Sequence, residues 1–180
     1  MFPHVSFRKF DPYSSEDCAL MAKWENDPLI RSLFQVFRDE ISFARVATVE
    51  SISQNYKPAE DNPTEQSFMI MYEGKPVGEM SFYLDRRPIL TAKSNTAWAG
   101  IVIGEAHARG CGVGRLAMQE LEARAKKAGA QRIELGVFEF NKTAIRFYEK
   151  LGYREFVRLP GYTWMAGKMW ADIRMLKELN

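Results

Sequence analysis

Histidine and cysteine are scarce in this chain of 180 residues, which holds two of each. A structural or catalytic zinc site needs several such ligands at short spacings, and the sequence contains no such cluster. Ser-His-Asp or Cys-His catalysis would have to use one of only two histidines. The sequence also lacks a nucleophile-elbow motif, so this kind of catalysis is not expected. Cys18 and Cys111 lie far apart in the sequence, which is more typical of a reducing cytoplasm than of a disulfide framework.

Long apolar runs and a strong net charge are missing as well. The longest near-apolar run, residues 97–104, is far shorter than the roughly 20 residues that a membrane helix requires. The N-terminal segment lacks the apolar core of a signal peptide. The net charge is only +2, and the basic residues are dispersed. We therefore expect a cytoplasmic protein with neither a membrane nor a nucleic acid as its partner.

What is present fits a globular α+β domain spanning residues 1–180. Hydrophobic residues make up 46% of the chain and charged residues 27%, close to the average of folded domains. Apolar periodicity predicts strands and helices in alternation, with a polar loop at residues 57–64 and a loop containing Pro160-Gly161 between the last two strands. The predicted strands are 5–10, 66–72, 76–84, 96–103, 132–138, 153–159 and 168–176. The predicted helices are 16–24, 29–38, 48–55, 112–128 and 141–151.

The segment Arg109-Gly110-Cys111-Gly112-Val113-Gly114 joins a predicted strand to the clearest predicted helix. Glycines at such a junction let the backbone approach a ligand, and the N–H groups at the helix start attract a pyrophosphate. Alone, the pattern is a weak signal, because a strand-to-helix turn can need glycine for structural reasons only. It matches neither a dinucleotide-binding fingerprint nor a P-loop.

A second motif, Asn141-x-x-Ala144-x-x-x-Tyr148-Glu149-Lys150-x-Gly152-Tyr153, follows downstream. Together the two motifs closely resemble the GNAT superfamily of acetyl-CoA-dependent N-acetyltransferases. The start of the chain, the segment 24–28 and the residues 103–105 look like the branch of ribosomal-protein N-terminal, spermidine and some aminoglycoside acetyltransferases. The resemblance implies a mixed, largely antiparallel sheet of about seven strands with a splayed parallel pair, flanked by helices. It places acceptor-side helices at about residues 14–56 and the acetyl-CoA-binding core at about 96–153.

The resemblance also implies how acetyl-CoA is held. Main-chain N–H groups of residues 109–114, the glycine-rich loop, would bind the pyrophosphate. The strand before this loop would pair with the pantetheine arm, and an N–H near Val102 would polarise the thioester carbonyl. Asn141 would bond the pantetheine, cap its helix, or do both. No metal is implied. The expected acetyl-CoA-binding residues are Ile101, Val102, Ile103, Arg109, Gly110, Cys111, Gly112, Val113, Gly114, Arg115, Asn141 and Ala144.

Tyr148 would be the general acid that protonates the departing thiolate, although packing on the apolar helix face is the alternative. Relatives often carry the general base on the strand before the glycine-rich loop, and here residues 95–103 contain no acid. Glu79 is the best candidate, against the alternative of a solvated strand glutamate. Asp27, Asp39 and Glu40 are other candidates. Acceptor contacts are expected from Trp24, Asp27, Phe34 and Tyr162.

The sequence therefore predicts an enzyme that transfers an acetyl group directly from acetyl-CoA to a primary amine, on a small molecule or a protein N-terminus. Two alternatives stay open: a noncatalytic acyl-CoA-binding or sensing module, and a generic α/β binding domain with a structural glycine turn. A monomer and a homodimer are equally compatible with the sequence. Cys111, at a helix start, is a candidate redox-sensitive thiol or an inert loop residue.

Overall fold

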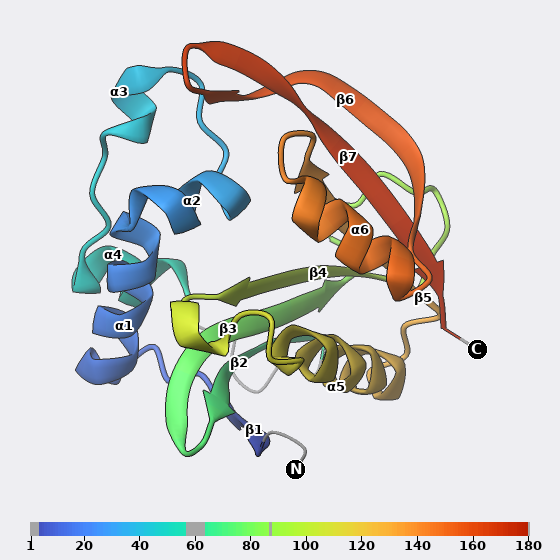
Figure 1. Cartoon of the computed structure of the whole chain (residues 1–180). Helices are drawn as coiled ribbons and strands as arrows, with labels where there is room; N and C mark the ends of the chain where they lie inside the picture. The colour runs from blue at the N-terminus through green and yellow to red at the C-terminus, as the bar shows by residue number, and fades with distance from the viewer. Residues whose placement is uncertain (1–3, 57–63, 87, 180) are drawn as a thin grey trace.

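A computed structural model describes residues 4–56, 64–86 and 88–179, so most of the loop expected at 57–64 lies outside the described residues. Its centre is a mixed seven-stranded sheet in the order β1-β2-β3-β4-β5-β7-β6 (Figure 1). All neighbouring strands are antiparallel except the parallel pair β4 and β5. The mixed sheet expected from the sequence is confirmed. The strands are β1 (Val5–Lys9), β2 (Glu65–Tyr72), β3 (Lys75–Leu84), β4 (Thr96–Ile103), β5 (Arg132–Phe138), β6 (Arg154–Met165) and β7 (Lys168–Glu178).

Helices cover both faces of the sheet, and each face has its own apolar core. On one face, α5 and α6 pack on alternate residues of the central strands through buried side chains such as Leu121 and Ile133. On the other face, α1, α2 and α4 pack over Met69 of β2 and Val102 of β4. The helices are α1 (Ser15–Asn26), α2 (Pro28–Phe34), α3 (Glu40–Phe43), α4 (Val49–Asn55), the 3₁₀ turn η1 (Ala106–Ala108), α5 (Val113–Lys127) and α6 (Lys142–Lys150).

The parallel pair separates soon after it begins. Only Thr96–Trp98 of β4 pair with Arg132–Glu134 of β5. Beyond that point β5 continues to pair with β7 as far as Phe138, while β4 continues to pair with β3 as far as Ile103. The second half of β4 therefore has no strand on its β5 side. This slot is the splayed pair expected from the resemblance.

The helix predicted over residues 29–38 is shorter than expected and ends at Phe34. The chain leaves the helix because Phe37 is bound to β6. Its N–H donates to Thr163 Oγ1 at 3.0 Å, and its carbonyl accepts from the N–H of Trp164 at 2.8 Å. The short helix α3 follows, which apolar periodicity did not predict. It forms because Asp39 and Ser42 make a reciprocal capping box.

The loop expected between residues 159 and 168 begins later than the sequence predicts, because β6 runs through Pro160 and Gly161. The strand pairing shifts register between Leu159 and Thr163, and Gly161 adopts a φ of +62°. A proline is tolerated here since β6 is an edge strand, where a missing N–H breaks no ladder. The connection to β7 lies instead at Ala166-Gly167, where both residues have positive φ.

Candidate active site

The glycine-rich loop leads into the start of α5, where main-chain N–H groups are exposed at the first turn. Gly110 and Gly112 have φ of +75° and +85°, and a side chain at either would point into open space. Gly112 is the N-cap and provides no side-chain bond, while the N–H of Leu116 is the one that reaches the Gly112 carbonyl. The preceding helical N–H groups are thus left for a ligand. Such a helix start can attract an anionic group.

The Arg109 side chain in the loop holds the loop in place by hydrogen bonds to the main chain. Arg109 donates from Nε to the Ile103 carbonyl at 2.9 Å and from Nη2 to the Gly104 carbonyl at 2.8 Å, which holds the loop against the end of β4. Cys111 is an exposed free thiol whose Sγ lies 3.4 Å from the His107 carbonyl. Arg115 is exposed on the first turn of α5. The backbone is therefore the principal feature offered to an anion.

Trp24 ties α1 to the residues just before this loop. Its side chain is 1% exposed, and the indole N–H donates to Glu105 Oε1 at 2.9 Å. The same carboxylate oxygen pairs with Lys23 at 2.6 Å. Expected from the sequence as an acceptor contact, Trp24 lies in the packed interface between α1 and the end of β4.

The strand expected to receive pantetheine borders the slot. Ile101, Val102 and Ile103 are half-buried, with Ile101 and Ile103 packed on the α5–α6 face and Val102 on the opposite face. Asn141 caps α6, as one of its two sequence interpretations predicted, by accepting the N–H of Ala144 at 3.1 Å. The cap holds α6, with Tyr148 on it, next to α5.

Tyr148 is a buried residue of the α5–α6 core. Its ring contacts those of Phe147 and Tyr153 at centroid distances of 5.2 Å and 5.8 Å. Burial raises the pKa of the phenol, so the hydroxyl keeps its proton at neutral pH. The side chain is therefore both packed on the apolar face and available as a proton donor.

Glu79 lies in the middle of the sheet, directly opposite Val102 on the neighbouring strand. It is 4% exposed, and its Oε1 is buried without a hydrogen-bond partner. The pKa of Glu79 is raised to about 8. Burial is the largest cause and the Glu25 charge adds to it, while the Ser81 hydroxyl acts in the opposite direction. The sequence alternative of a solvated glutamate is wrong, because side chains from both neighbouring strands and the helices cover this position.

Glu79 and Tyr148 belong to opposite faces of the sheet. Tyr148 is part of the α5–α6 core. The cross-strand partners of Glu79, Met69 and Val102, pack with the α1–α4 helices instead. Two tyrosines on the Glu79 side, Tyr56 and Tyr83, have pKa values raised by burial and next by the Glu79 charge. A buried carboxyl on β3 and a buried phenol on α6 thus lie on the two faces of the sheet.

The other expected acceptor contacts lie on α2 and β6. The Asp27 carboxylate caps α2 by accepting the N–H groups of Leu29 at 2.9 Å and Ile30 at 3.3 Å. Phe34, at the end of α2, packs against the core of the α1–α4 face. The Tyr162 hydroxyl accepts from Arg174 Nη2 at 3.4 Å. These three side chains come from the two ends of α2 and from β6, and among the described residues no hydrogen bond or ring contact joins them.

Sequence reasoning did not find Arg31, which is buried on this side of the sheet, or Glu25, which is half-buried. Arg31 is 8% exposed, and its Nε has no hydrogen-bond partner. Burial raises the pKa of Glu25, the Gln35 hydrogen bond lowers it, and the Arg31 charge lowers it further. Nothing in the residue spacing identified these two residues, because each lies in an ordinary helical pattern whose burial depends on tertiary packing.

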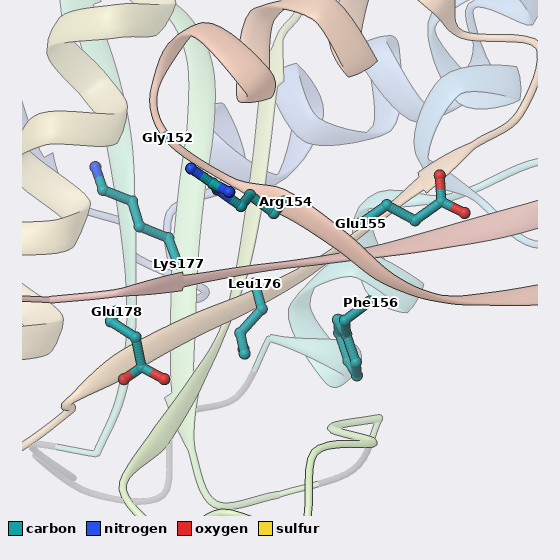
Figure 2. A pocket seen from close by; sticks show the side chains of 7 residues that line it. All are labelled: Gly152, Arg154, Glu155, Phe156, Leu176, Lys177 and Glu178. Carbon is teal, nitrogen blue, oxygen red and sulfur yellow. The ribbon is translucent and has the colours of Figure 1, made fainter.

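A pocket of about 500 Å³ lies elsewhere, at the paired ends of β6 and β7. Figure 2 shows Phe156, Leu176 and Glu178 on one side of these strands and Lys177 on the other. None of its lining residues is an expected site residue; they are Gly152, Arg154, Glu155, Phe156, Leu176, Lys177 and Glu178. We assign the candidate site to the slot and its glycine-rich loop, because the residues expected to bind acetyl-CoA lie there.

Among the described residues, no helix is long and apolar enough to cross a bilayer. Within the same ranges, no group of three or more His, Cys, Asp or Glu side chains is arranged to hold a metal ion.

Comparison with known proteins places the geometry in a family. The model of the acetyltransferase (GNAT) family matches residues 13–153, which include the slot, the glycine-rich loop and α6. The chain belongs to the GNAT family. Among curated relatives, this GNAT protein is 49% identical over 45 residues to the uncharacterized N-acetyltransferase YdgE of Bacillus subtilis (strain 168). That match covers 25% of this chain and 29% of YdgE. A second relative from the same organism is covered over 54% of its length, so the matches span about half of these relatives or less.

Solved structures share the GNAT fold over nearly the whole chain. The spermidine N-acetyltransferase of Vibrio cholerae, in complex with CoA and spermine, superposes with a TM-score of 0.77 at 18% identity. That match covers 97% of this chain and 95% of the other. The ribosomal-protein-alanine N-acetyltransferase of Brucella melitensis superposes with a TM-score of 0.73 at 18% identity, covering 97% and 99%. Both belong to classes named in the sequence resemblance.

Proposed function

We propose that this GNAT protein transfers an acetyl group from acetyl-CoA directly to a primary amine, on a small molecule or a protein N-terminus. The observation that carries the proposal is the slot beside β4. It begins where Trp98 and Glu134 cease to pair, and its open strand leads directly to the N–H groups of the glycine-rich loop. One strand edge and one helix start can thus receive the two ends of an acyl-CoA. The known V. cholerae neighbour contains CoA, which supports the same ligand class.

The two buried titratable groups supply the proton transfers. The amine attacks the acetyl carbonyl carbon, a C–N bond forms, and the C–S bond to coenzyme A breaks. Glu79 accepts the proton that the amine loses, and Tyr148 donates its proton to the departing thiolate. The products are an amide and the free thiol of coenzyme A, and exchange with solvent restores both side chains. Their locations on opposite faces of the sheet allow the base to meet the acceptor and the acid to meet the cofactor.

The side chains around the slot favour direct transfer, because the described residues there offer a proton acceptor and a proton donor. The buried thiol of Cys18 on α1 is engaged in a hydrogen bond, in which its Sγ donates to the Pro12 carbonyl at 3.3 Å. We expect no acetylated enzyme intermediate. We also propose a cytoplasmic setting, in which both free cysteines stay reduced.

Release of free thiol from acetyl-CoA tests this function. The protein is assayed with a panel of polyamines, aminoglycosides, amino acids, ω-amino acids and N-terminal peptides, and thermal unfolding is followed with and without coenzyme A. We expect stabilisation by coenzyme A and thiol release with one acceptor class. Stabilisation without turnover on any class would favour the noncatalytic sensing module. An absence of both effects would contradict the proposed function.

A further inference from the structure

Arg31 is a buried cation that the protein itself does not fully satisfy. Its guanidinium lies over the rings of Phe37 and Phe43, at 5.1 Å and 5.2 Å from their centroids. Nη2 donates to the Arg45 carbonyl at 2.6 Å and reaches Gln35 Oε1 at 3.5 Å. Nε is buried and makes no hydrogen bond. Since burying a charge without a close counterion is costly, this arrangement calls for an explanation.

No carboxylate within the described ranges forms a salt bridge with Arg31. Glu25 is near enough for the two charges to interact, but its Oε2 accepts from Gln35 Nε2 at 2.7 Å, so Gln35 stands between the two groups. The pKa of Glu25 is raised by burial, and that of Glu79 is raised to about 8 by burial. Arg31 therefore lacks a direct carboxylate partner within the described residues, and the nearby carboxyl of Glu25 is held by Gln35.

The position of Arg31 connects it to the acceptor side. It lies on α2, three residues before Phe34, and its ring partner Phe37 is bound through its main chain to Thr163 of β6. Phe43, the other ring partner, lies 6.2 Å from the ring of Trp164. The Arg31 side chain therefore occupies an aromatic enclosure where α2 meets β6, the two elements expected to border the acceptor.

Arg31 and Glu79 each carry one buried polar atom without a hydrogen-bond partner. Within the described chain, the buried side-chain nitrogen and oxygen atoms without a hydrogen-bond partner are Arg31 Nε and Glu79 Oε1. Glu25 interacts electrostatically with both residues, so all three share one side of the sheet. One unsatisfied group is a hydrogen-bond donor with a positive charge, and the other is an acceptor. A molecule with a carboxylate and an amine would satisfy both.

Resting on the proposed function, we propose that the acceptor is an amino-acid-like molecule whose carboxylate binds Arg31 while its amine meets Glu79. A guanidinium recognises a carboxylate with directed, charge-assisted hydrogen bonds, and the aromatic enclosure strengthens them by excluding water. Polyamines, which carry no anionic group, would leave Nε unsatisfied. Arg31 is thus a specificity-determining residue rather than only a brace for the segment between α2 and α3.

The first test compares acceptors that differ only in the anionic group. The protein is assayed with acetyl-CoA and with L-α-amino acids, β-alanine, 4-aminobutyrate, 5-aminopentanoate and 6-aminohexanoate, each beside its carboxamide. We expect kcat/KM to be at least about 10-fold higher for the carboxylate of the best pair, mostly through KM. The ω-amino series also reports the spacing between Arg31 and the reacting amine. Equal rates within every pair, or a preference for a polyamine, would overturn the proposal while leaving the acetyltransferase function intact.

The second test changes Arg31 itself. Arg31→Lys and Arg31→Met are compared with Arg124→Met, a matched control in which a guanidinium lies 4.2 Å from the Phe68 ring but pairs with Glu120 on α5. We expect both Arg31 variants to raise KM for the carboxylate about 10-fold or more and to lose the preference over the carboxamide, while the control keeps both values. A preference that survives in Arg31→Lys and Arg31→Met would contradict the proposal. If Arg31→Met does not fold, the carboxylate preference of Arg31→Lys is compared with that of the unmodified protein.

Binding separates failure of this inference from failure of the function. With coenzyme A present, the carboxylates should raise the Tm of the unmodified protein and of Arg124→Met, but not of Arg31→Lys. This readout needs no turnover. Without any acetyl transfer, such a shift would support the anion site and contradict the proposed catalysis. The absence of any shift, together with equal rates, would overturn the anion site.

Discussion

The ring of Trp24 occupies the space into which a side chain on Gly104 would have to project. A Cβ built on Gly104 would lie 2.4 Å from three atoms of the indole, a distance that real Cβ atoms essentially never show. Gly104 directly follows β4 and precedes the glycine-rich loop. One close contact therefore joins the acceptor-side helix α1 to the segment expected to hold acetyl-CoA.

Gly104→Ala should destabilise the protein by about 1–3 kcal/mol, because the buried indole cannot move away without disturbing α1. Urea unfolding measures the effect. Gly100→Ala is the control, since its Cβ would meet only the Ser81 hydroxyl at 3.4 Å. Equal stability of the two variants would show that α1 adjusts freely at this contact.

Gly112→Ala should weaken coenzyme A binding by at least about 10-fold, because the new methyl group would project into the space where the pyrophosphate is expected. Gly161→Ala is a matched control, since Gly161 also has a positive φ and open space around its Cβ. Both variants should lose about 1–2 kcal/mol of stability from the left-handed backbone, but only Gly112→Ala should change the Kd. Calorimetric titration with coenzyme A distinguishes them.

Tyr148→Phe should lower kcat by about 10²-fold or more, because the thiolate would leave without its proton donor. The Kd for coenzyme A should change little, since the ring still packs against Phe147 and Tyr153. Steady-state kinetics and coenzyme A titration of the same preparation test both parts. An unchanged kcat would assign Tyr148 to packing alone.

Glu79→Gln should remove the acidic limb of the activity profile. In the native protein the carboxyl has a pKa of about 8, so the rate should rise with pH through that value as the base loses its proton. The variant should be slower by about 10²-fold, with a flat profile in this range. The same limb in the variant, measured as kcat/KM against pH, would assign the base to another group.

The same substitution has a consequence for stability. Because the pKa of Glu79 is raised in the folded state, its contribution is fully present below the ordinary pKa and is lost as pH rises toward about 8. The free energy of unfolding should therefore fall over that interval in the native protein. In Glu79→Gln this component should be absent, as urea unfolding at a series of pH values will show. A fall of equal size in both proteins would place its origin elsewhere.

Much of this protein was determined by the local sequence. Local residue composition predicted β4 and β5 at their observed bounds. The glycines after α5 and α6 end those helices because their positive φ suits few other residues. The two linked motifs predicted the family and the slot. Local signals work there because dihedral preferences and apolar spacing act within a few residues.

Tertiary structure alone decided the rest. Phe37 leaves the helical path because β6 binds its main chain, and β6 passes through Pro160 because that strand lies at the sheet edge. The burial of Glu79 and the unsatisfied Nε of Arg31 arise only when helices α1 and α2 cover the sheet. Solvent exclusion and charge depend on neighbours distant in the chain, which residue spacing does not encode.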